Sequence, residues 1–108
     1  MPEQMSIFDF IPIPEQSLED MTDDEIVRKI EEGTGLKFWL NTRFGNYYET
    51  KVRGVTFYIH MSRYDLDDNQ NRFIGVGWDK KSEGASAPRD SVKEAIDWIK
   101  TQIRTRDF

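Results

Sequence analysis

Basic and aromatic side chains are interleaved along the strands that we expect between residues 36 and 62, and this mixture suits nucleic-acid binding. Aromatic rings stack on unpaired bases, while lysine and arginine attract the phosphates of a single strand. Open sheet faces also carry such residues for cross-strand packing alone, so a purely structural face is the alternative. The residues of the candidate nucleic-acid face are Lys37, Trp39, Arg43, Lys51, Tyr58 and His60, and further candidates are Tyr47, Arg53 and Phe73.

Metal binding and catalysis find little support in the sequence. Asp65, Asp67 and Asn69 have the spacing of a calcium-binding loop. However, Gln70 stands where that loop needs a glycine, and Val76 stands where it needs a bidentate glutamate. The chain has one histidine and no cysteine, so it can form neither a thiolate metal site nor a Cys–His pair. We therefore predict no enzymatic activity, no metal and no cofactor.

A short apolar segment near the N-terminus, Gln4-Met5-Ser6-Ile7-Phe8, precedes every expected helix and strand. It resembles the peptide that binds the bacterial sliding clamp, in which Gln, Leu, Ser or Asp, Leu and Phe follow one another. Gln4, Ser6 and Phe8 match this pattern, while Met5 and Ile7 replace leucines with apolar residues of similar volume. The resemblance implies that Gln4 bonds at the edge of the clamp's groove, and that Ile7 and Phe8 fill its apolar pocket. We identify no family for the globular part.

The residues after this peptide favour an extended chain. Pro12 and Pro14 fix their own backbone angles and push Ile11 and Ile13 towards extended conformations. We therefore expect residues 1–20 to form an extended tail that presents the peptide to the clamp. The alternative is a tail whose Ile7, Phe8 and Phe10 simply pack on the domain.

The net charge of −5 is unevenly distributed along the 108 residues. Residues 1–35 contain ten acids against two bases, whereas residues 36–108 contain ten acids against thirteen bases. This asymmetry indicates either internal pairing or two surfaces with different partners. An inhibitor that mimics DNA and occludes a basic groove is therefore an alternative function. Its acidic run consists of Glu15, Glu19, Asp20, Asp23, Asp24, Glu25, Glu31 and Glu32.

Length and composition predict one domain plus a short tail. The sequence shows no long apolar run and no secretory signal, so we expect no membrane association and a cytoplasmic location. A compact, acidic, cysteine-free protein of this kind would suit a phage or a mobile element. The sequence leaves the oligomeric state open.

Periodicity and capping signals predict the elements that must position these residues. Thr22 and Glu25 have capping-box spacing at the start of a helix that we expect to stop at Gly33, with Gly35 close behind. Ser91 and Glu94 repeat that spacing in a helix over about 90–104. Alternation predicts four strands, over about 36–41, 47–52, 55–62 and 72–78, with a tight turn at Gly45-Asn46, another at Arg53-Gly54, and a loop over 79–88.

The expected fold is therefore an α+β domain over residues 21–108. Its order is helix, four-stranded antiparallel meander, helix, with both helices on one face of the sheet. Leu36, Phe38 and Leu40, like Val55, Phe57 and Ile59, are expected to face the helices. The candidate nucleic-acid residues then fall on the opposite face.

Overall fold

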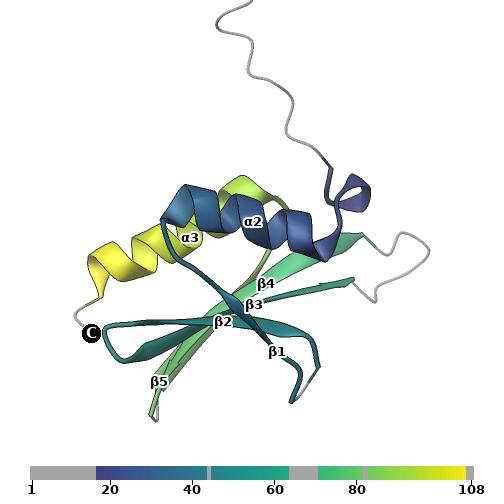
Figure 1. The fold of residues 1–108 in the computed structure, drawn as a ribbon. Helices are drawn as coiled ribbons and strands as arrows, with labels where there is room; N and C mark the ends of the chain where they lie inside the picture. Colours follow the sequence, from purple (N-terminus) through teal and green to yellow (C-terminus); the bar gives the residue numbers. More distant parts are fainter. Residues whose placement is uncertain (1–16, 44, 64–70, 82, 107–108) are drawn as a thin grey trace, which may run out of the picture.

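The computed structural model describes residues 17–43, 45–63, 71–81 and 83–106, and it confirms an α+β fold with an antiparallel sheet (Figure 1). The helices are the single 3-10 turn η1 (Leu18–Asp20), α2 (Asp23–Thr34) and α3 (Val92–Thr105). The strands are β1 (Trp39–Asn41), β2 (Tyr47–Val52), β3 (Val55–Arg63), β4 (Arg72–Lys80) and β5 (Glu83–Arg89). Figure 1 shows α2 and α3 next to each other on the same side of the sheet.

The strands pair in chain order, and every neighbouring pair is antiparallel. The meander is as predicted, but it has five strands rather than four. The tight turn at Arg53-Gly54 is confirmed, because Val52 pairs with Val55 and both turn residues have positive φ, 51° and 81°. The tight turn at Gly45-Asn46 is wrong, because residues 42–46 together connect β1 to β2.

The loop predicted over residues 79–88 is also wrong, because this segment forms the end of β4 and most of the edge strand β5. Lys80 pairs with Glu83 across the turn between them, and Lys81 in that turn has φ 54°. β5 consists of small and charged residues with one proline, so it lacks the β-branched and aromatic residues that indicate a strand. Pairing with β4 orders it, and its edge position tolerates Pro88.

β1 is shorter than the alternation of its sequence predicts. Only Trp39–Asn41 pairs with β2. Leu36 and Phe38 precede the strand and pack against the core, in keeping with their expected direction. Leu40 points to the same side by register, opposite Tyr48, but it stays 52% exposed at the sheet edge.

Both long helices begin at the predicted caps. The Thr22 side chain accepts a hydrogen bond from the Glu25 N–H, and the Glu25 carboxylate accepts one from the Thr22 N–H, each at 3.2 Å. The Ser91 hydroxyl caps α3 by accepting from a backbone N–H at 3.1 Å. The helix α2 continues through Gly33, the first predicted stop, and ends at the second glycine, a left-handed Gly35 with φ 76°.

The core lies between one face of the sheet and the two helices. Phe57 of β3 and Trp78 of β4 are cross-strand neighbours within it. Gly33 of α2 lies so close to Ile96 of α3 that a Cβ there would sit 2.3 Å from the isoleucine Cδ1. The buried apolar side chains of this core are Leu18, Met21, Ile26, Ile30, Val55, Phe57, Ile59, Ile74, Val76, Trp78, Val92, Ala95 and Ile99.

One arginine ties the start of the domain to the sheet. Arg72, at the start of β4, donates hydrogen bonds to the Leu18 carbonyl at 2.6 Å and to the Met21 carbonyl at 2.5 Å. It also forms an ion pair with the Asp23 carboxylate at the first turn of α2. The Arg72 side chain is only 13% exposed, so these bonds are shielded from water.

The predicted tail boundary must therefore move towards the N-terminus. Leu18 is 6% exposed and belongs to the core, although the sequence places residues 1–20 in an extended tail. Residues 17–20 are part of the packed domain. The rest of the predicted tail, residues 1–16, lies outside the described residues.

Replacing Arg72 should lower the free energy of unfolding far more than replacing Arg63, its partner across the β3–β4 ladder. Arg72→Ala should lower the free energy of unfolding by about 2–4 kcal/mol, because it leaves buried carbonyls and a carboxylate without their donor. Arg63 pairs with Glu19 in a bridge that is about half exposed, so Arg63→Ala should cost less than about 1 kcal/mol. Urea unfolding of both variants measures the difference, and equal losses would contradict the anchoring role of Arg72.

Candidate functional site

The outer face of the sheet, turned away from α2 and α3, is formed by every second residue of each strand. On β3 the residues Thr56, Tyr58 and His60 alternate with neighbours that are fully buried in the core. Strand pairing then places residues of the other strands on the same face. Those that shape the site are Tyr47, Glu49, Tyr58, His60, Phe73, Gly75, Gly77, Asp79, Ser86 and Pro88.

Two aromatic rings of β3 lie directly against glycine backbone of β4. Tyr58 pairs with Gly77, and His60 pairs with Gly75. A Cβ built on Gly77 would sit 2.4 Å from the Tyr58 Cζ, and one built on Gly75 would sit 2.2 Å from the His60 Cε1. No side chain fits at either glycine while the rings keep these positions, so the glycines mark a close approach of ring and backbone.

These two rings belong to a row of four. Tyr47 approaches His60 with ring centroids 4.9 Å apart, and it meets Tyr58 edge to face at 6.0 Å. His60 in turn meets Phe73 edge to face at 6.3 Å. Edge-to-face contacts at these separations are favourable, so the row from β2 across β3 to β4 holds itself in place without a covering helix.

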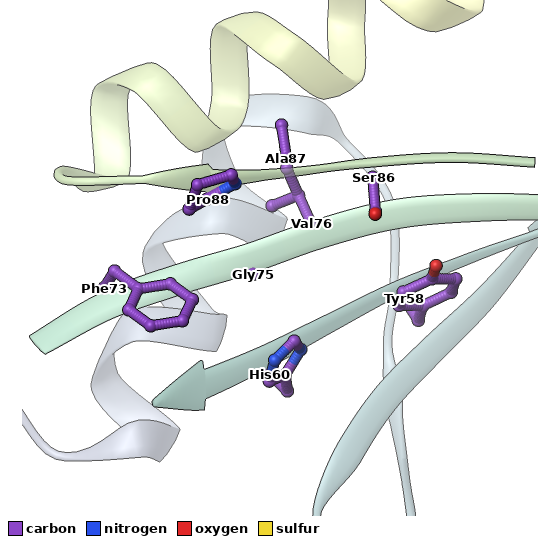
Figure 2. A pocket seen from close by; sticks show the side chains of 8 residues that line it. All are labelled: Tyr58, His60, Phe73, Gly75, Val76, Ser86, Ala87 and Pro88. Atoms are coloured by element: carbon purple, nitrogen blue, oxygen red, sulfur yellow. The ribbon is translucent and has the colours of Figure 1, made fainter. Parts of the chain in front are cut away.

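The row borders two shallow hollows of about 280 Å³ each. The acidic pocket, as we call the first, is lined by Tyr47, Glu49, Tyr58 and Asp79. The second, the apolar groove, is shown in Figure 2, where Gly75 lies between the aromatic rings and β5. The apolar groove is lined by Tyr58, His60, Phe73, Gly75, Val76, Ser86, Ala87 and Pro88. Tyr58 lines both hollows.

The acidic pocket brings two carboxylates close to two tyrosine rings. Burial raises the pKa of the Tyr58 hydroxyl above its usual value, and the negative charge of Asp79 and the neighbouring Tyr47 raise it further. Glu49 accepts a hydrogen bond from the Asn41 side chain at 3.1 Å. Among the described residues, no lysine or arginine forms an ion pair with Glu49 or Asp79. The pocket is therefore a site of net negative charge.

His60 does not supply a cation to this face. Burial lowers the pKa of its imidazole below the usual value, so the ring is neutral near pH 7. Its Nδ1 atom is buried and has no hydrogen-bond partner in the described structure. The imidazole therefore acts as one more flat ring in the aromatic row, and phosphate attraction must come from other residues.

The predicted basic residues gather at the β1 side of the sheet. Trp39 is 50% exposed on the outer face of β1, directly across from Glu49 of β2. Lys51 follows two residues after Glu49 on the same face. Lys37 lies two residues before Trp39, so extending the register would place it across from Lys51, although the ladder ends at Trp39. We call Lys37, Trp39 and Lys51 the basic edge; Arg43 is exposed in the connection that follows β1.

Other predicted residues lie outside the described part of the chain. This holds for the clamp-like peptide Gln4 to Phe8 and for the calcium-like segment Asp65 to Asn69. Conversely, the predicted site residues do not include Glu49, Asp79 or the two glycines beneath the rings. The sequence does carry a signal for the glycines, because they alternate along β4 just as aromatic residues alternate along the preceding strand β3. It carries none for the two carboxylates, because only the strand register makes them neighbours.

Most of the acidic run near the N-terminus is used by the fold itself. These carboxylates bond within the domain, which favours internal pairing over a second acidic surface. Glu15 lies outside the described residues. The contacts are Glu19 with Arg63, Asp23 with Arg72, Asp24 with the Tyr48 hydroxyl, Glu25 with the N-cap Thr22, and Glu31 with the Phe38 N–H.

Comparison of the chain with protein-family models, with curated proteins and with solved structures found no match. Within the described ranges, no three His, Asp or Glu side chains come together in the manner of metal ligands. None of the described helices has the length and hydropathy that a membrane crossing requires.

Because the folded state holds His60 in its neutral form, the protein should lose stability as the pH falls. Its unfolded pKa is about 6.5 and its folded pKa is lower, so between these values the unfolded chain holds a proton that the native state lacks. The free energy of unfolding should therefore fall on acidification through about pH 6.5. Urea midpoints measured between about pH 8 and pH 5 should show this slope in the parent and lose it in His60→Phe. An identical slope in both proteins would contradict the assignment.

Proposed function

We propose that the protein is a non-enzymatic accessory protein of DNA metabolism that works in the cytoplasm. Its N-terminal peptide docks on the bacterial sliding clamp, and the basic edge of its sheet contacts single-stranded nucleic acid. The observation that carries the proposal for the domain is the half-exposed indole of Trp39, which lies beside two lysines on an uncovered sheet face. A phage or mobile-element protein would use such an arrangement to act at replicating DNA.

The chemistry of the basic edge supports contact with a single strand. An exposed indole offers a face on which any base can stack, and stacking of this kind tolerates sequence variation. Lys37 is exposed, and Lys51 is exposed on the outer face of the neighbouring strand, so both ammonium groups can approach the phosphates next to a base that stacks on Trp39. The acidic pocket repels phosphate, and its Glu49 lies directly across from Trp39, so it confines the contact to the Lys37 and Lys51 end of this edge.

The resemblance of Gln4 to Phe8 to the clamp-binding peptide supports the docking half of the proposal. Two adjacent apolar anchors, Ile7 and Phe8, suit a short peptide that fills a hydrophobic pocket on a partner. The packed domain begins by Ser17, and the intervening residues can span at most about 30 Å at the limiting length per residue. Docking would thus hold the domain close to the clamp and to the DNA it encircles.

Binding of the peptide to a bacterial sliding clamp should depend on its two matching ends. A labelled peptide of residues 1–14 should bind with a dissociation constant of tens of micromolar or tighter, roughly −6 kcal/mol, in fluorescence anisotropy. Gln4→Ala with Phe8→Ala should abolish binding because it removes the expected edge hydrogen bond and one of the two pocket anchors.

A matched control peptide restores the two leucines of the clamp-binding pattern. Met5→Leu with Ile7→Leu changes two apolar residues without altering charge or length, so it should bind at least as well as the parent peptide. Absence of binding by the parent, or equal binding by the Gln4→Ala, Phe8→Ala peptide, would refute the clamp half.

Binding of the whole protein to labelled oligothymidine should depend on Trp39. Trp39→Ala should weaken binding by about 1–3 kcal/mol because it removes the stacking face. Lys37→Gln and Lys51→Gln should each reduce the salt slope of log K by about 0.7, because each removes one phosphate contact. Anisotropy titrations over a range of salt measure both quantities.

Leu40 provides the control for this experiment. It adjoins Trp39 and is exposed to the same degree, 52% against 50%, but it points to the opposite side of β1. Leu40→Ala should leave the affinity unchanged. Equal losses in both variants, or no salt-dependent binding by the parent, would leave the basic edge without a nucleic-acid role.

A further inference from the structure

We infer that the acidic pocket binds a cationic side chain, lysine or arginine, carried by a segment of a partner protein, whose neighbouring apolar side chain occupies the apolar groove. This inference goes beyond the proposed contacts with the clamp and with nucleic acid. It concerns the centre of the outer face, whereas the basic edge lies at its β1 side.

The shape of the acidic pocket suits the end of a long side chain. Its walls come from three neighbouring strands, with Tyr47 and Glu49 on β2, Tyr58 on β3 and Asp79 on β4. The two tyrosine rings meet edge to face at 6.0 Å with planes 76° apart, so they form a corner rather than a flat wall. An ammonium or guanidinium group in that corner can approach a ring face, which attracts cations electrostatically.

The charges of the pocket select a cation. Glu49 is paired across the ladder with Tyr58, and the Asp79 carboxylate is close enough to raise the pKa of the Tyr58 hydroxyl. Two carboxylates without an ion-pairing lysine or arginine in the described structure favour an incoming positive charge and repel phosphate. Calcium needs six to eight oxygen ligands, which this pair of carboxylates does not provide.

The apolar groove extends the recognition to a second side chain. Tyr58 forms a wall of both hollows, so a ligand in one lies directly beside a ligand in the other. The rings of His60 and Phe73 and the ring of Pro88 surround the glycine floor at Gly75, as Figure 2 shows. Apolar lining of this kind suits an aliphatic or aromatic side chain. The charge and shape together fit a protein segment in which a basic residue adjoins an apolar one.

The test uses the full chain and two short peptides that differ only in charge. Acetyl-Leu-Lys-Leu-amide and acetyl-Leu-Gln-Leu-amide are titrated separately while the ring resonances of Tyr47 and Tyr58 are followed by NMR. The lysine peptide should give saturable shifts of both tyrosines, at least fivefold tighter than the glutamine peptide. Raising the salt should weaken the lysine peptide and leave the glutamine peptide unchanged.

Variants then assign the binding to the two carboxylates. Glu49→Gln with Asp79→Asn keeps size and hydrogen bonding, and it should weaken the lysine peptide at least fivefold. Glu32→Gln, an exposed carboxylate of α2 on the helix side, is the matched control and should change nothing. If the double variant does not fold, the comparison of the two peptides on the parent protein still decides the question.

Three results would overturn the inference. The first is equal binding of both peptides, which would make the pocket a non-selective apolar surface. The second is the absence of any saturable shift up to about 10 mM, a concentration beyond which affinity is negligible. The third is movement of the tyrosine resonances with protein concentration alone, which would show that a second copy of the chain occupies the pocket.

Discussion

The outer face depends on the contact between the two rings of β3 and the glycine backbone of β4. Tyr58 and His60 can lie flat only because Gly77 and Gly75 carry no Cβ. Those positions allow Tyr47 and Phe73 to complete the aromatic row, and they leave a hollow on each side of Tyr58. A sheet with one face under helices usually exposes its other face to water, and here an aromatic row packs across that face.

Charge divides the outer face into regions with different chemistry. The basic edge combines an exposed indole with two lysines, whereas the central pocket combines tyrosine rings with two carboxylates. The neutral imidazole of His60 keeps the two regions distinct because it adds no positive charge at the centre. On the other side of the molecule, Arg72 and the helix cap use carboxylates of the first third for stability. The two regions meet at Glu49, which lines the pocket and lies directly across from Trp39.

The sequence predicts the local structure well where side-chain alternation and capping are strong. The buried alternation of Val55, Phe57 and Ile59 and the box at Thr22 were read correctly, because periodicity and hydrogen-bonding geometry act over a few residues. β5 could not be recognised, because its small residues owe their strand conformation to pairing with β4. The pairing of Glu49 with Tyr58 was likewise invisible without the register. The aromatic half of the site was therefore predictable, and its acidic half was not.

The most direct test of this account is the chemical shift of the glycine Hα protons beneath the rings. In each glycine the Hα that occupies the Cβ position lies against a ring face, so the Gly77 and Gly75 signals should move well upfield of ordinary glycine values. The Gly77 shift should disappear in Tyr58→Leu, and the Gly75 shift should disappear in His60→Leu, while each leaves the other glycine displaced. Ordinary glycine shifts in the parent protein would contradict the ring positions, and with them both hollows of the outer face.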